Sequence, residues 1–166
     1  KDGLTNVTVQ PVKVPHWVRG VESATLMSPV RRDLEILGLG QSVATPPEGI
    51  TAEVVVVKDF AQLDSLGADK VKGKIVLFDA PYRGYGQTVM YRAVGPSRAA
   101  SMGAVATLVR SVTSLNMRQP HTGSLSYDET MPKVPAAAVS VEDSMMLAWL
   151  AKQGPVRVRL KMQAHM

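Results

Sequence analysis

Histidine and cysteine supply most metal ligands and nucleophiles in proteins, and this chain holds few of them. Its 166 residues include no cysteine and three histidines, at positions His16, His121 and His165. No two histidines have the i, i+4 spacing of a helical zinc site, and none is followed two residues later by an aspartate. The lack of cysteine excludes a Cys-ligated metal and a thiol nucleophile. We therefore predict no metal site and no bound cofactor in this chain.

Three further patterns that could support chemistry have simpler interpretations. Serines are plentiful, but no Gly-x-Ser-x-Gly elbow is present to expose one as a nucleophile. Gly38-Leu39-Gly40 resembles the start of a dinucleotide-binding loop, yet Val43 stands where the third glycine belongs. Glu142 and Asp143 fall in the first turn of a predicted helix, where carboxylates complement the helix dipole. The sequence therefore predicts no catalytic residue.

One polar segment is a candidate for function. Residues 111–133 form a long stretch that contains two prolines and a glycine, and such loops in compact domains are usually functional or mobile. Within it, residues 119–123 (Gln-Pro-His-Thr-Gly) form a polar, turn-forming cluster. The alternative interpretation is a structural turn in which His121 bonds the backbone.

The charge balance limits the partners that we expect. Nineteen basic and 14 acidic residues leave a net charge of +5, which is compatible with an acidic or nucleic-acid partner. There is no dense Lys/Arg run and no interleaved aromatic platform, so we expect a solvated basic surface and no nucleic-acid binding. No apolar run approaches about 18 residues, so we expect no membrane span. No signal peptide opens the chain, which begins abruptly, and we expect it to be a fragment of a larger protein.

The elements that would position these residues are mostly short strands. Alternating or β-branched apolar residues predict strands over 7–14 (interrupted by Pro11), 23–27, 34–39, 51–58, 74–79, 104–110, 134–139 and 156–162. Helices are predicted over 60–66, capped by Asp59, over 96–102, and from Ser140, with Asp143 as its capping-box partner.

Some expectations concern single segments of this pattern. Residues 82–91, rich in Gly and Tyr, look irregular. In the last helix, Val141, Met145, Ala148 and Trp149 share one face at helical spacing, and we expect Met145 and Met146 to fill the core. Together the elements indicate a single β-rich domain over residues 1–166, with helices packed on one side of a β layer.

Several blocks of the sequence resemble the protease-associated (PA) domain. They are 71–77 (VKGKIVL), like its V-x-GKIVL strand, 98–109 (RAASMGAVATLV), like its A-x-x-x-GA helix-to-strand turn, and 134–140 (VPAAAVS) with the following helix, like its IPxxxIS strand and closing helix. Segments 11–20, 37–40, 45–54 and 120–123 are similar to the PA insert of M28-family zinc peptidases. The resemblance is strongest to the plasma glutamate carboxypeptidase (carboxypeptidase Q) branch of that family, and it covers nearly the whole chain.

The resemblance implies a fold and a setting. The fold is the swivelling β/β/α type, mixed α and β and β-rich, a β-sandwich or open barrel with a few short flanking helices. The domain is an insert in a larger aminopeptidase or dipeptidase that holds two zinc ions. That parent is extracytoplasmic: secreted or periplasmic, or lysosomal or extracellular in a eukaryote. Its ligand series of His, Asp, Glu, Asp and His is absent here, so no zinc ligand is carried over to this chain.

Three functions follow as hypotheses. The first is a non-catalytic accessory domain that shapes access to the peptidase site, with three partners: the catalytic domain of the same chain, the peptide substrate and a possible homodimer. The residues expected to face these partners are His121, Thr122, Gly123, His16, Trp17 and Arg19. The second is a stand-alone module that binds peptides or proteins. The third, an independent hydrolase, is disfavoured by the three scattered histidines.

Overall fold

The computed structural model describes residues 2–115 and 117–166, so Lys1 and Asn116, the latter in the predicted loop 111–133, lie outside it. Its strands are β1 (Glu22–Ser28), β2 (Arg32–Leu34), β3 (Ile36–Gly38), β4 (Ile50–Val57), β5 (Ile75–Phe78), β6 (Ala106–Arg110), β7 (Ala136–Val139) and β8 (Arg157–Met162). Its helices are α1 (Phe60–Leu66), α2 (Ala68–Val71), α3 (Tyr85–Ala93), α4 (Gly95–Ser101) and α5 (Val141–Ala151). None of the described helices is both long and apolar enough to span a bilayer.

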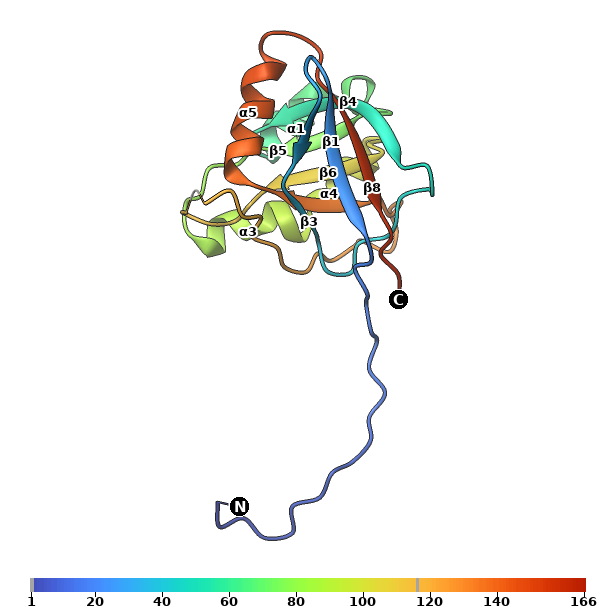
Figure 1. Ribbon diagram of the computed structural model, residues 1–166, viewed down its shortest axis with the longest axis vertical. Helices are drawn as coiled ribbons and strands as arrows, with labels where there is room; N and C mark the ends of the chain where they lie inside the picture. Colours follow the sequence, from blue (N-terminus) through green and yellow to red (C-terminus); the bar gives the residue numbers. More distant parts are fainter. Residues whose placement is uncertain (1, 116) are drawn as a thin grey trace.

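The eight strands form one sheet, in the order β2-β1-β8-β4-β5-β6-β7-β3. The pairs β4–β5, β5–β6 and β6–β7 are parallel, and the other pairs are antiparallel. The sheet curls until β3 approaches β1, where the Gly38 N–H donates to the Glu22 carboxylate at 2.9 Å (Figure 1). The result is a nearly closed barrel with short helices, which confirms the predicted mixed α and β fold.

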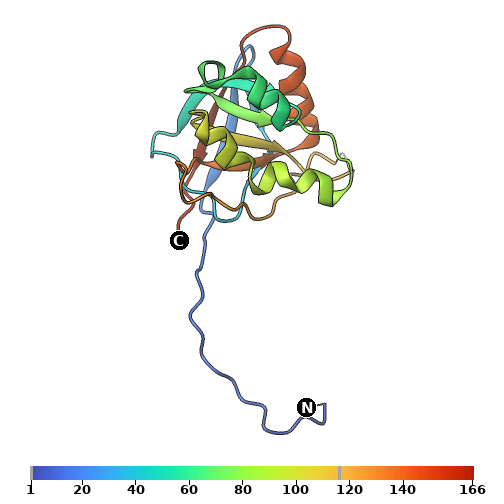
Figure 2. The same ribbon diagram turned by 180° about the vertical axis from the view of Figure 1, so that it is seen from behind.

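The helices cover two regions of the barrel, whereas the sequence predicted helices on one side. One core cluster contains apolar residues of β1, β4, β5, β6 and β8 and is covered by α5 through Leu147. The other lies under α1, α2 and α4 and includes Leu63, Val71 and Ala99. Figure 2 shows α1, α3 and α4 on the side of the barrel opposite the view of Figure 1. Because the parallel strands β5, β6 and β7 are almost wholly buried, both of their faces need cover.

The N-terminal residues leave the barrel as an extended tail (Figures 1 and 2). The strand predicted over residues 7–14 is wrong: this stretch joins no sheet among the described residues, and its valines are 72–95% exposed. Alternating valines favour an extended chain, but a strand also needs a partner for its backbone. Beyond the tail, Val18 and His165 exchange N–H···O bonds of 2.8 and 2.9 Å, so the two terminal segments lie side by side.

Two helices, α2 and α3, were not predicted from the sequence. Residues 85–93 form α3 although the segment was expected to be irregular, because tertiary packing overrides its weak propensity: Tyr91 stacks on Phe60 and Phe78 with ring centres 4.8 and 5.8 Å apart. In α5 the Ser140 cap is confirmed, since its side chain accepts from the Asp143 N–H.

The buried face of α5 is not the predicted one. Met145 and Trp149 are 50 and 61% exposed, whereas Asp143, Ser144 and Leu147 are buried. The two polar residues lie inside because each has a partner there: the Ser144 hydroxyl donates to Asp79 at 2.8 Å, and Asp143 accepts from a backbone N–H. Met145 is therefore not the predicted core filler, whereas Met146 is partly buried and packs against the core.

Candidate interaction surface

The Gly38 carbonyl, at the end of β3, joins the two segments that the sequence singled out. It accepts a hydrogen bond from the Thr122 hydroxyl at 3.0 Å and from the Arg19 guanidinium at 3.3 and 3.4 Å. The Gly38 N–H is bound by the Glu22 carboxylate, which also lies 3.7 Å from Arg19. A Cβ at position 38 would lie 2.5 Å from the Glu22 carboxylate, so a side chain there would displace that carboxylate from the junction. Segments about a hundred residues apart thus meet at one peptide unit.

The N-terminal half of this surface is held by Trp17 and Arg19. The Trp17 indole N–H donates to the Ser42 carbonyl at 2.9 Å, and the Arg19 guanidinium lies 5.3 Å from the indole ring centre. Both side chains are half-buried, whereas His16, one residue before Trp17, is exposed at the base of the tail. Trp17 and Arg19 therefore fix the point where the tail leaves the barrel.

The other half is the segment 119–125, whose backbone is bonded to the barrel along its length. The His121 N–H donates to the Ser111 hydroxyl at 2.8 Å, and Gly40 exchanges bonds of 3.0 Å with Gly123 and Leu125. His121 itself is exposed. The predicted alternative, a turn in which His121 bonds the backbone, differs from the structure: residues 119–123 form no turn, and His121 bonds the Ser111 side chain through its own backbone N–H, with its side chain exposed.

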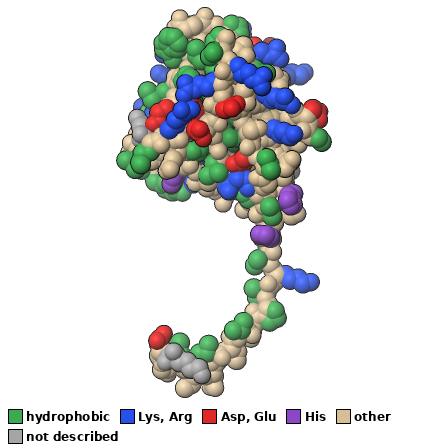
Figure 3. All heavy atoms as spheres, in the orientation of Figure 1, with side chains coloured by type: hydrophobic (Ala, Val, Ile, Leu, Met, Phe, Trp, Pro, Cys, Tyr) green, Lys and Arg blue, Asp and Glu red, His purple; other side chains and the backbone are tan. Residues whose placement is uncertain are grey.

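The described part of the chain offers no cluster of metal ligands at this surface. No group of three or more His, Cys, Asp and Glu side chains placed to hold a metal occurs in residues 2–115 and 117–166. In Figure 3 the histidine side chains appear as separate groups on the lower part of the molecule and on the tail. The arrangement presents backbone-anchored polar side chains, which suits contact with another surface.

Curated relatives match the chain over nearly all of its length. No family model matches it. It is 50% identical to "Carboxypeptidase Q" of Xenopus laevis over 165 residues, and 47% identical to "Carboxypeptidase Q" of Homo sapiens over 165 residues. Each match covers 99% of this chain and 35% of the relative. The chain is a homologue of one segment of carboxypeptidase Q. It spans about a third of the length of these carboxypeptidase Q relatives.

Two solved peptidase structures contain a segment with the fold of this chain. A peptidase M28 precursor from Shewanella amazonensis is 34% identical with a TM-score of 0.87, covering 92% of this chain and 36% of that one. BSAP, a zinc aminopeptidase from Bacillus subtilis, has a TM-score of 0.58 over 87% of this chain and 31% of its own, and at 23% identity it shows the fold alone. The resemblance to a segment of M28 peptidases, and to the carboxypeptidase Q branch, is confirmed.

Three residues of this surface escaped the sequence prediction: Glu22, Gly38 and Arg92. The first two form the barrel seam, and the third lies under the loop with its NH1 3.4 Å from the Thr122 carbonyl. Only Gly38 carried a signal, since glycine in the middle of an apolar stretch can mark a close approach of backbone. Glu22, the first residue of β1, and Arg92, in a Gly- and Tyr-rich segment, carried no such signal in the sequence.

The Glu22 carboxyl gives the seam a pH dependence. Burial raises its pKa above the ordinary value of 4.5, against the opposing effects of the Gly38 N–H and of Arg19. A raised folded-state pKa contributes stability below pH 4.5 that is lost as the pH rises through the folded-state value. We expect the Tm of the wild type relative to Glu22→Gln to be highest in acid and to decline towards neutral pH. Thermal unfolding of both proteins from about pH 3 to about pH 8 measures this difference in Tm. A Tm difference that does not change with pH would contradict the raised pKa.

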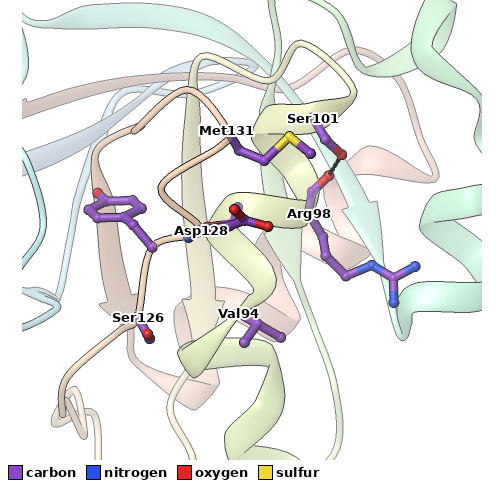
Figure 4. Close-up of a pocket in the computed structure, with 8 residues that line it drawn as sticks. Val94, Arg98, Ser101, Ser126, Asp128 and Met131 are labelled. Atoms are coloured by element: carbon purple, nitrogen blue, oxygen red, sulfur yellow. Dashed lines mark hydrogen bonds between the residues drawn. The ribbon is translucent and has the colours of Figure 1, made fainter.

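A hollow elsewhere on the surface is a weaker candidate for a binding site. It measures about 280 Å³ and lies between α4 and residues 126–131. In Figure 4 the Arg98 side chain extends away from Asp128, in keeping with its 2.8 Å ion pair to Asp64. Asp128 is bonded within its own turn to Thr130, and its N–H is bonded to Ser97. The charged groups around the hollow are thus already paired, and we assign no ligand to it.

Proposed function

We propose that the chain is a non-catalytic accessory domain of an exported zinc-dependent aminopeptidase or dipeptidase, and that it shapes access of peptides to the catalytic domain of the same chain. The observation that carries this proposal is the 50% identity to carboxypeptidase Q along 99% of the chain, within relatives about three times as long. The parent would be secreted or periplasmic, or lysosomal or extracellular in a eukaryote.

The positions of the two terminal segments support a domain inserted into the parent. Val18 and His165 are paired, so the chain enters and leaves at one end of the barrel. The candidate surface lies at this same end, because Gly38 is next to Glu22 and a Cβ on it would lie 3.0 Å from Met162, the last residue of β8. In the proposed parent, the surface would therefore lie on the side where both terminal segments leave the barrel.

Zinc chemistry belongs to the parent in this proposal. The donor set of this chain does not fit a zinc centre, because its described residues hold no cluster of three ligands. What this chain contributes is surface: the exposed His121 and His16, and the half-buried Trp17, can contact a peptide or the rim of a neighbouring site.

Removal of the 119–123 segment from the full-length protein tests this function. We expect kcat/KM for longer peptides to change by about tenfold relative to a dipeptide, because positioning of an extended substrate contributes to that ratio. His121→Ala, which removes no bond of the loop backbone, should change it in the same direction. Glu129→Ala, at an exposed position of the same long loop, is the matched control. Unchanged turnover of all substrates in both variants would reject the access role.

An exposed apolar face favours a second candidate, a protein-binding module. Met145 and Trp149 of α5 are half or more exposed, and large apolar side chains on one helix face often mark interfaces. Titration of the isolated domain against peptides, and sedimentation of the domain alone, distinguish a foreign partner from a second copy. Binding abolished by Trp149→Ser but not by His121→Ala would favour this role over the first.

A further inference from the structure

Arg92 is a buried cation without a carboxylate partner among the described residues. It lies in the last turn of α3 and is 5% exposed. Its NH2 donates to the Tyr85 hydroxyl at 2.7 Å, its NH1 lies 3.4 Å from the Thr122 carbonyl, and its Nε has no partner. Burying a guanidinium with so few acceptors costs free energy that a neutral side chain would not. Stability alone therefore does not account for an arginine at this position.

The guanidinium lies directly against the backbone of Gly123. A Cβ at position 123 would lie 2.5 Å from the Arg92 Cζ and 2.7 Å from both of its terminal nitrogens. The planar group thus supports the loop from below, while its NH1 faces the preceding carbonyl. A lysine has no such plane, and a larger residue at 123 would have to push the Arg92 guanidinium aside.

The loop has three further contacts: His121 with Ser111, Thr122 with Gly38, and Gly123 and Leu125 with Gly40. They involve loop residues both before and after the point where Arg92 contacts the loop. All of them use backbone groups or the Thr122 hydroxyl of the loop. None of them uses the imidazole of His121, which is exposed. The contacts hold the backbone in one position and leave the side chain that faces outwards unconstrained by bonds.

We propose that Arg92 is a positioning residue: its guanidinium plane sets the height of residues 121–123 above α3 and so the direction in which His121 faces the peptidase partner. The inference rests on the proposed function for its consequence in catalysis. The structural part of the inference, the placement of His121 by Arg92, does not depend on the proposed function. The role of Arg92 is to make one loop position more favourable than its alternatives, at a cost in desolvation.

The first test uses NMR on this chain. With three histidines, the His121 imidazole signals are assigned by comparison with His121→Gln. Arg92→Lys keeps the charge without the plane, and Arg92→Met keeps the length without the charge. We expect both to shift the His121 signals. Arg98→Lys, the same change at an exposed arginine of α4, should leave them in place.

The second test uses the full-length protein. We expect Arg92→Lys to lower kcat/KM for longer peptides about tenfold, mainly through KM, while Arg98→Lys does not. Unshifted His121 signals in both folded Arg92 variants would overturn the placement. Loss of the folded state in both would overturn it as well, because Arg92 would then be required for folding. Shifted signals with unchanged turnover would retain the placement and reject the access role of the loop.

Discussion

Replacement of Phe78 by alanine is expected to lower the free energy of unfolding by about 3–5 kcal/mol. Phe78 ends β5, is fully buried, and meets Phe60 at 5.5 Å and Tyr91 at 5.8 Å between ring centres. The start of α4 packs on the same ring, since a Cβ on Gly95 would lie 2.9 Å from it. Alanine would leave a cavity between α1, α3 and α4 that these rigid elements cannot fill.

Urea and thermal unfolding measure this loss, which corresponds to a fall in Tm of about 10 °C for a domain of this size. Tyr82→Ala, at an aromatic residue that is 37% exposed, is the control and should change stability by no more than about 0.5 kcal/mol. Because Phe78 also supports α3, the His121 signals are expected to broaden in Phe78→Ala. A loss below about 1 kcal/mol would show that the aromatic cluster is not a principal part of the core.

Replacement of Asp143 by alanine is expected to cost about 2–4 kcal/mol, a second large effect. The side chain is 1% exposed and accepts a bond of 2.8 Å from the Glu35 N–H, in the corner between β2 and β3. Arg32 and Arg118 lie 3.9 Å away, but both are nearly half exposed, so solvent screens them. Most of the loss would come from the unsatisfied N–H and from the helix N-terminus.

Asp143→Asn separates these contributions. The amide oxygen can still accept from the Glu35 N–H, so we expect a loss of only about 1 kcal/mol. The small part due to the two arginines should shrink at high salt in the wild type. Urea unfolding of both variants at low and high salt checks this. If asparagine were as damaging as alanine, the charge and not the hydrogen bond would be the principal contribution.

Asp143 also illustrates what a local pattern can and cannot predict. Its place in the first turn of α5, three residues after Ser140, indicates a capping box, and the structure contains only the Ser140 half of it: the Ser140 hydroxyl accepts from the Asp143 N–H. The Ser140 N–H donates to the Glu35 carbonyl, so the Asp143 carboxylate is not its partner. The same pattern places Asp143 on an exposed helix start with Glu142. Its burial depends on the β2–β3 corner, which lies more than a hundred residues earlier in the chain. The spacing of neighbouring residues cannot predict that Asp143 binds the Glu35 N–H, so far away in the sequence.

The sequence alone determined most of the regular elements and the relationship to M28 peptidases. Strand β4 with its four valines, strand β8 with its alternating side chains, and the caps of α1 and α5 are specified by residues close together in the sequence. They can therefore be predicted from the sequence. The small number of residues that could bind a metal can also be counted in the sequence. The exceptions include α3, which needs the aromatic cluster, and the tail, whose valines have no strand to pair with among the described residues. The short helix α2 was not predicted either, and the strand predicted over 34–39 is divided between β2 and β3.

Only the tertiary structure decided where the candidate surface is and what holds it. Arg19 and Thr122 share the Gly38 carbonyl because the barrel closes between β1 and β3, and Arg92 lies beneath Gly123 because α3 packs below the loop. Closure of the barrel is a property of the whole sheet: twist and register accumulate over eight strands before the two edges meet. The sequence could name His121, Trp17 and Arg19 as separate candidates, but their meeting point depends on that closure.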